Sequence, residues 1–222
     1  AFTYYTGFRV NSGEYKVMGL APYGKPKYKA LILDKLIDLK EDGTFRLDQS
    51  YFNYAVGLTM INKKFSNLFG KPVRKPESDQ LTQFHMDIAS SIQAVTEEVV
   101  LKMVRSLAKE YQIPNLCMAG GVSLNCVANG KILRDQSFKE IWIQPAAGDA
   151  GGSLGAALAL WHIEQGNNRT INPNDNMKGS YLGCEFTQDQ IENELKLLGA
   201  KFKKVNYIDL IKTTSEYLSK GK

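Results

Sequence analysis

The stretch of sequence that decides the fold is residues 116–125, which read Leu-Cys-Met-Ala-Gly-Gly-Val-Ser-Leu-Asn. Its apolar start predicts a short buried strand, and the two glycines predict a tight turn into a helix. Paired glycines let a ligand approach the backbone, and the N–H groups that open a helix attract phosphate or a ribose-linked anion. Gly120, Gly121 and Asn125 are therefore candidate binding residues. The alternative is a plain turn in which Asn125 only caps the helix.

The elements on both sides of this stretch continue one pattern. After it we expect a helix through Leu133, a short strand at residues 141–145 and a third helix beyond residues 148–152. Before it we expect a long amphipathic helix, capped by Ser78 or Asp79, with apolar residues every three or four positions: Phe84, Ile88, Ile92, Val95, Val99, Met103 and Leu107. Helices that alternate with strands predict an α/β fold, a sheet with helices on its faces.

A second glycine-rich turn carries an acid. Asp149 lies just before a predicted helix, and the small residues behind it leave space beside its carboxylate. A carboxylate in such a place is a candidate oxygen ligand for a divalent metal. The alternatives are that Asp149 only caps the helix and that Gly151, Gly155 and Ala156 only permit close helix packing.

A third candidate segment lies near the start of the chain, where residues 13–24 read GEYKVMGLAPYG. Glu14 and Lys16 are two positions apart and cannot share a helix face, but an irregular turn lets both reach a cleft. The alternative is a surface loop whose charges are solvated.

Turn residues and polar runs predict the organisation of the rest. Residues 36–48 contain Glu-Asp-Gly between two short alternating runs, which predicts a β-hairpin. Between Gln165 and Gly179 lie five asparagines, which indicate a connector and a domain boundary. We therefore expect a first domain at residues 1–178 and the start of a second α/β domain at residues 179–222.

The predicted second domain begins with a helix and continues with a basic strand and another helix. Thr187 and Gln190 form a capping-box pair at the start of the first helix, and Gly199 is placed to end it. Two helices and one strand cannot close a core, so we expect this segment to be the first part of a larger domain.

Composition excludes several classes of protein. The chain has 222 residues, 43% of them hydrophobic, and a net charge of +5. Most of the excess positive charge lies in residues 201–222. Positive charge confined to one end of the chain argues against nucleic-acid binding. No apolar run reaches the roughly 18 residues of a membrane helix. The cysteines show no metal-type spacing, which indicates reduced thiols and a cytoplasmic protein: Cys117, Cys126 and Cys184.

Four ordered segments together resemble one family. They are GEYKVMGLAPYGKP at residues 13–26, AGGVSLNCVANGKIL at 119–133, QPAAGDAGGSLGAAL at 144–158 and YLGCEFT at 181–187. They resemble the O-carbamoyltransferases of antibiotic and nodulation-factor biosynthesis. The second and third are more weakly similar to the proteins that make threonylcarbamoyl-adenosine on tRNA.

The resemblance implies a fold, cofactors and substrates. It implies an actin-like, sugar-kinase-like ATPase fold, of which residues 1–178 form one lobe. In the family, carbamoyl phosphate and ATP give carbamoyl-adenylate in a C-terminal domain. The actin-like domain, which holds a divalent metal (iron in the family), then passes the carbamoyl group to a hydroxyl of a small-molecule acceptor.

By motif, the resemblance also assigns residues. It implies that Gly120, Gly121, Asn125 and Gly151 hold the nucleotide and that Asp149 is a metal ligand. Glu14 and Lys16 fall in the segment that lines the same cleft.

One departure from the family pattern concerns the metal. The family's metal is also held by two histidines in a His-x-x-x-His motif, which this chain lacks. We therefore expect those ligands upstream of Ala1 and read the chain as a fragment that is inactive alone and prone to self-association. Two other functions remain open: a sugar-kinase-like phosphotransferase of the same fold, and a non-catalytic binding module.

Overall fold

The computed structural model describes residues 1–172, 174–175 and 177–221, and it divides into two compact units. The first unit is Ala1–Arg169, and the second begins at Thr170. No helix among these residues combines the length and apolar character that a membrane span requires.

The first unit is mostly helical. Its helices and strands, in chain order, are α1 (Phe2–Tyr5), α2 (Glu14–Leu20), η1 (Ala21–Tyr23), α3 (Lys29–Lys35), β1 (Ile37–Leu39), β2 (Phe45–Leu47), η2 (Gln49–Tyr51), α4 (Lys63–Phe69), α5 (Gln83–Tyr111), β3 (Asn115–Met118), η3 (Gly121–Leu124), α6 (Cys126–Asp135), β4 (Glu140–Ile143), α7 (Gly151–Ala159) and the π-turn η4 (Leu160–Glu164).

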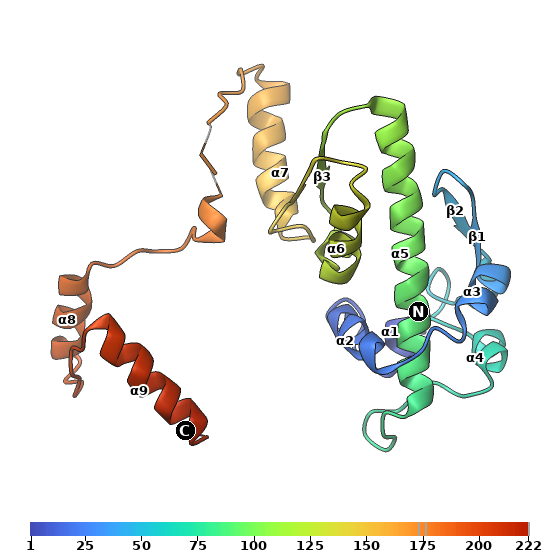
Figure 1. Cartoon of the computed structure of the whole chain (residues 1–222), viewed down its shortest axis with the longest axis horizontal. Coiled ribbons are helices and arrows are strands. Elements are labelled where there is room, and N and C mark those ends of the chain that lie inside the picture. Colours follow the sequence, from blue (N-terminus) through green and yellow to red (C-terminus); the bar gives the residue numbers. More distant parts are fainter. Residues whose placement is uncertain (173, 176, 222) are drawn as a thin grey trace. The chain divides into compact units, whose positions relative to one another are not determined.

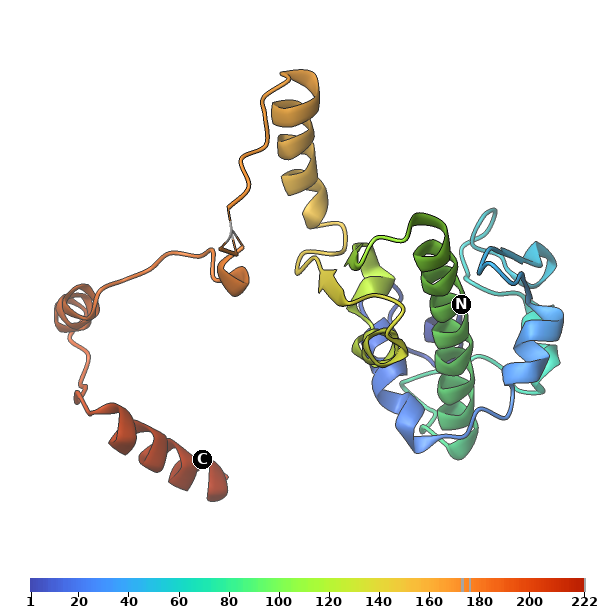
Figure 2. The same ribbon diagram turned by 45° about the horizontal axis from the view of Figure 1, so that its top comes forward.

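The long helix α5 organises this unit, as the apolar spacing predicts. It runs between α3, α4 and the hairpin on one side and α2 and α6 on the other (Figure 1, Figure 2). The predicted caps are wrong, since α5 starts after Thr82. The carboxylate of Asp79 instead accepts the Lys75 N–H and the Ser78 hydroxyl, which closes a separate turn before the helix.

Aromatic side chains fill the largest core, on the side of α5 that faces α1, α3 and α4. The rings of Tyr5 and Phe65 meet edge to face with centroids 5.3 Å apart, and Phe69 lies against both. Such pairs contribute about 0.5–1.5 kcal/mol beyond the area that they bury. This core packs on the N-terminal half of α5, and the opposite face of the helix contacts α2 and α6.

The predicted hairpin is confirmed. Strands β1 and β2 pair antiparallel, with Ile37 opposite Leu47 and Leu39 opposite Phe45. Gly43 in the turn has φ +88°, and a Cβ there would lie 2.4 Å from the backbone nitrogen of Met103. Only glycine satisfies both conditions.

The predicted α/β alternation is confirmed in the second half of the unit. Strands β3 and β4 are parallel, with Leu116 opposite Ile141, and α6 connects them. The inner side chains of the strands pack on a small core centred on Val104, Ile132 and Phe138. The described residues thus form a mixed α/β fold with two two-stranded sheets.

The second unit contains η5 (Lys178–Ser180), α8 (Gln188–Leu197) and α9 (Tyr207–Ser219). The capping box of Thr187 and Gln190 is confirmed, and Gly199 follows the helix end with φ +65°.

The predicted basic strand is wrong, because residues 201–206 form no strand. A strand needs a ladder partner, and among the described residues of this unit none is assigned. Instead, the Lys204 ammonium lies 2.8 Å from the Glu192 carboxylate on α8. Residues 173 and 176 of the predicted connector, and residue 222 at the end of the predicted second domain, lie outside the described residues.

Candidate functional site

The two glycine-rich turns meet at one edge of the parallel pair. The first follows β3 and the second follows β4, so both leave the carboxyl ends of neighbouring strands. The backbone N–H of Gly120 donates to the carbonyl oxygen of Ala147 across 2.8 Å. The two turns therefore lie side by side at this edge. In α/β proteins, this edge of a parallel sheet is where ligands bind.

A hollow of about 410 Å³ opens beside the second turn, between the strand ends and α7. Cys117 and Trp142 line it from the strands, and Leu158 lines it from α7. A Cβ added at Gly148 or Gly152 would meet no atom within 4 Å, so small residues keep this space open. The walls are mostly apolar, as in many small-molecule sites.

Asp149 lies exposed in the second turn. The alternative that it only caps the helix is wrong, because Ala150 is the N-cap of α7 and no side chain caps that helix. Gly151 is constrained by packing, since a Cβ there would lie 2.1 Å from the carbonyl oxygen of Ala146. The turn therefore leaves the Asp149 carboxylate free for another role.

The described side chains do not form a metal centre on their own. Within the part of the chain that the structure describes, no group of three or more His, Cys, Asp or Glu side chains is placed to hold an ion. A single carboxylate binds a divalent metal poorly, because protein sites normally supply three or more ligands. Asp149 by itself does not make a metal site.

The first turn is built around a glycine with an unusual backbone. Gly120 has φ +97° and ψ 152°, a region that only glycine populates readily. Its carbonyl oxygen accepts the Ser123 hydroxyl at 2.7 Å, which tightens the turn. A Cβ at Gly121 would meet no atom within 4 Å, so this position stays open.

One buried polar atom near the first turn lacks a partner. The amide nitrogen of Asn129 donates to the carbonyl oxygen of Ser123 at 2.6 Å. Among the described residues, its Oδ1 is the buried side-chain polar atom without a hydrogen bond. A buried acceptor of this kind is normally satisfied by an ordered water, so it does not by itself indicate a ligand site.

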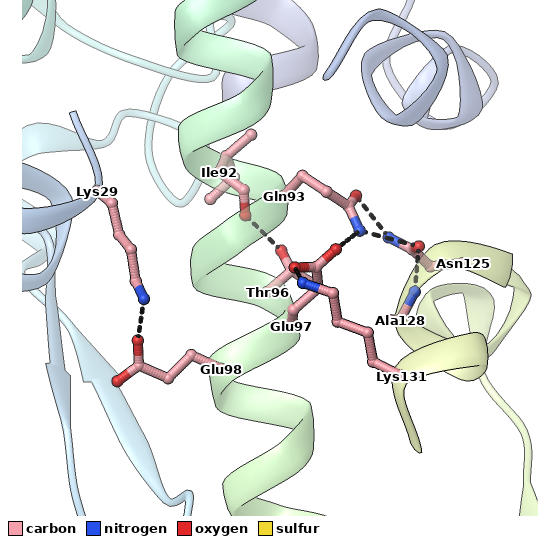
Figure 3. A network of polar contacts seen from close by, with 9 residues as sticks. All are labelled: Lys29, Ile92, Gln93, Thr96, Glu97, Glu98, Asn125, Ala128 and Lys131. Carbon is pink, nitrogen blue, oxygen red and sulfur yellow. Dashed lines mark hydrogen bonds and ion pairs between the residues drawn. The ribbon is translucent and has the colours of Figure 1, made fainter. Parts of the chain in front are cut away.

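Asn125 does cap α6, as the alternative held, but it has further contacts. Its Oδ1 accepts the Ala128 N–H at 3.1 Å. Its amide also pairs with that of Gln93 on α5, which is linked to Glu97 and Lys131 (Figure 3). Gln93 and Glu97 were not predicted from the sequence. Their signal is a pair of polar residues one helical turn apart beside the apolar stripe of α5.

The Glu14 segment is a helix rather than an irregular turn, which corrects that expectation. Glu14 and Lys16 are exposed on different faces of α2, and Glu14 accepts the Asn11 N–H at 3.0 Å. The Met18 sulfur lies 3.9 Å from the Cys126 sulfur at the start of α6. The segment thus lies next to the Asn125 end of the site.

These features define an α/β protein whose parallel pair presents a glycine-rich, ligand-accessible edge. The chain belongs to the carbamoyltransferase N-terminus family, whose model matches residues 1–158.

Three relatives illustrate the similarity. An uncharacterized Synechocystis protein, sll1178, is 65% identical over 196 residues, which cover 88% of this chain and 32% of the relative. Nodulation protein NolNO of Sinorhizobium fredii is 33% identical over 209 residues, 94% of this chain and 28% of the relative. Nodulation protein NolO of Bradyrhizobium diazoefficiens is 37% identical over 147 residues, 66% of this chain and 25% of the relative. The chain therefore spans about a third or less of these relatives.

Proposed function

We propose that this chain is part of an ATP-dependent O-carbamoyltransferase. The whole protein makes carbamoyl-adenylate from carbamoyl phosphate and ATP and transfers the carbamoyl group to a hydroxyl of a small-molecule acceptor. The observation that carries this proposal is the hydrogen bond between Gly120 and Ala147, which brings both glycine turns to one ligand-accessible edge. Family membership supplies the chemistry of the transfer.

In the proposed site, the nucleotide lies along the first turn. Gly120 and Gly121 let its phosphates approach backbone N–H groups, and Asn125 adds a side-chain donor. Gly151 keeps the second turn close enough to form the other wall. Glu14 and Lys16 flank the Asn125 end from α2, where the ammonium favours an anionic ligand.

The proposed transfer is an acyl transfer. The acceptor oxygen forms a bond to the carbamoyl carbon, the bond to the AMP oxygen breaks, and the hydroxyl proton is released. Negative charge grows on the carbonyl oxygen in the transition state, and fixed N–H donors stabilise such charge. Binding both reactants at one edge also provides orientation, which lowers the barrier further.

We further propose Asp149 as one ligand of a divalent metal, which is iron in the enzymes that the sequence resembles. The remaining ligands must come from outside this chain. The same resemblance supports an actin-like fold and a second catalytic domain that begins near residue 179. The absence of metal-type spacing among the cysteines supports a cytoplasmic location, and exposure of the inner wall of the cleft in a fragment supports self-association into a homo-oligomer.

The test is transfer of label from carbamoyl phosphate by the intact gene product. Wild-type protein, Asp149→Asn and Asp34→Asn are incubated with ATP, labelled carbamoyl phosphate and a panel of hydroxyl-bearing small molecules. Asp34 is the matched control, because it is exposed and forms an ion pair with its neighbour Lys35. We expect carbamoylated product from wild type and Asp34→Asn, and at least a roughly tenfold loss in Asp149→Asn. Phosphorylated acceptors without any need for carbamoyl phosphate would favour a kinase instead.

A further inference from the structure

Gln93 on α5 pairs with Asn125 through both atoms of each amide. The nitrogen of Asn125 donates to Oε1 of Gln93 at 2.9 Å, and the nitrogen of Gln93 donates to Oδ1 of Asn125 at 3.1 Å (Figure 3). Gln93 is buried, whereas Asn125 is half-buried beside the glycine turn. The pair therefore links a rigid position inside the unit to an accessible one at its edge.

Both ends of this pair fix which way the amides point. Glu97 accepts the other N–H of Gln93 at 3.0 Å, and the ammonium of Lys131 pairs with the same carboxylate. At the opposite end, the Ala128 N–H donates to Oδ1 of Asn125 at 3.1 Å. The Glu97 carboxylate, paired with an ammonium, accepts hydrogen bonds, and the Ala128 backbone N–H only donates. If either amide were turned around, two acceptors or two donors would face each other.

Counting donors and acceptors shows what remains for a ligand. Both N–H groups of Gln93 are used, and Oδ1 of Asn125 accepts two hydrogen bonds. One N–H of Asn125 is given to Gln93. Asn125 therefore offers its remaining N–H as a donor, and its oxygen is already occupied.

We infer that Gln93 is a positioning residue that holds Asn125 as a pure hydrogen-bond donor toward an oxygen of the bound nucleotide. This inference rests on the proposed function. The ligand atom is an acceptor, either a phosphate oxygen or a ribose oxygen. Glu97 and Lys131 act through Gln93, because they fix the amide that in turn fixes Asn125.

The same helix offers a matched control. Glu98 adjoins Glu97 but points to the other side of α5, where its carboxylate lies 2.7 Å from the Lys29 ammonium (Figure 3). Glu98→Gln therefore removes an ion pair of α5 without touching Asn125. Gln93→Leu removes the amide pair and keeps a side chain of similar size.

The first measurement is calorimetry of ATP binding to the intact gene product, fitted with two sites because the proposed C-terminal domain binds ATP as well. We expect Gln93→Leu to weaken one of the two sites roughly tenfold, the equivalent of one well-placed hydrogen bond, and Glu98→Gln to leave both sites unchanged. Inorganic tripolyphosphate and adenosine are separate probes. Tripolyphosphate binding that depends on Gln93 identifies a phosphate oxygen as the acceptor, and adenosine binding that depends on it identifies a ribose oxygen.

The second measurement does not require Gln93→Leu to fold. Side-chain amide resonances of wild type are recorded by NMR and assigned with Asn125→Ser. ATP is expected to shift the free amide proton of Asn125 far more than either proton of Gln93, a response that a purely structural pair would not give.

Two results would overturn the inference in different ways. If wild type shows two ATP sites while Gln93→Leu keeps both at equal affinity or the Asn125 resonance is unmoved, the role of Gln93 is wrong and the proposed function stands. If wild type and Glu98→Gln show no ATP site beyond that of the C-terminal domain, the nucleotide site proposed at the first turn is wrong, and the role of Gln93 falls with it.

Discussion

The backbone N–H of Gly120 and the carbonyl oxygen of Ala147 form a 2.8 Å hydrogen bond between two turns that belong to different strands. The parallel pairing of β3 and β4 fixes where the turns begin, and this bond fixes where they meet. The edge is therefore held by a backbone contact, and a fixed edge lowers the entropy cost of binding. A change in the first turn is expected to disturb the second.

Replacing each glycine of the first turn should have a different effect: one substitution lowers stability and the other weakens ligand binding. Gly120→Ala forces a side chain into φ +97°, so we expect the free energy of unfolding to fall by about 1–3 kcal/mol in urea denaturation. Gly121→Ala is the matched control, because its backbone is ordinary and its Cβ meets no atom within 4 Å. Gly121→Ala should keep its free energy of unfolding but bind ATP more weakly at the first turn, because the added methyl group occupies the proposed ligand space. Equal stability of the two variants would contradict the role of Gly120.

The cap of α5 should make stability depend on pH. The Thr82 N–H donates to Nδ1 of His85 at 3.1 Å, so the ring fills the place of a capping-box glutamine. Burial lowers the pKa of His85, and the charges of Arg74 and Lys71 lower it further. A histidine whose pKa is lower in the folded state than in the unfolded state stabilises the fold at pH values above its unfolded pKa of about 6.5. That contribution to the free energy of unfolding is lost as the pH falls below this value.

We therefore expect the free energy of unfolding of wild type to fall between pH 7 and pH 5. His85→Gln keeps a side-chain acceptor that does not titrate, so its stability should change less over the same range. His162 is present in both proteins, and the difference between them therefore reports His85. Identical pH profiles from calorimetry would refute the assignment.

A buried carboxylate fixes the segment after α2 on α5. Asp87 accepts the Lys25 N–H at 2.9 Å and lies 2.6 Å from the Lys27 ammonium. Burial alone would raise the pKa of Asp87, but the hydrogen bonds from Lys27, Gln83 and Lys25 outweigh it and lower the pKa to about 2.

Asp87→Asn should cost about 2 kcal/mol of unfolding free energy at pH 7, where the carboxylate is charged in both states. Since the folded pKa is depressed, this contribution is present above the unfolded value of about 3.9 and disappears as the pH falls toward 2. Denaturation curves of wild type and variant should therefore converge in acid. Asp34→Asn, at an exposed ion pair, should show little difference at any pH.

Local signals in the sequence predicted the long helix α5 and the hairpin of β1 and β2. The spacing of Phe84 to Leu107 predicted α5, and Glu-Asp-Gly predicted the hairpin, because periodicity and turn chemistry act over a few residues. The helix start at Thr82 was missed because Ser78 and Asp79 are equally good caps by type, and only their turn with Lys75 excludes them.

The site could be predicted only in part. The glycine turns and Asn125 are visible as motifs, and the order of the elements brings them to one edge. The pairing of Asn125 with Gln93 joins residues far apart in sequence and depends on how α5 packs on α6. The basic segment at residues 201–206 holds two strand-favouring residues, Phe202 and Val205, but pairing partners, which composition does not report, decide whether a strand forms.

The three exposed thiols provide a map of the proposed site. Cys117 lines the hollow beside the second turn, Cys126 follows Asn125, and Cys184 belongs to the second unit. In variants that keep one cysteine each, we expect ATP to slow the reaction of Cys117 and Cys126 with a chromogenic disulfide reagent and to leave the reaction of free glutathione unaffected. At ATP about ten times its dissociation constant the slowing should be roughly tenfold, because only ATP-free protein reacts. Unprotected Cys117 and Cys126 would exclude this edge as the nucleotide site, and equal slowing of glutathione would indicate a general effect on the reagent.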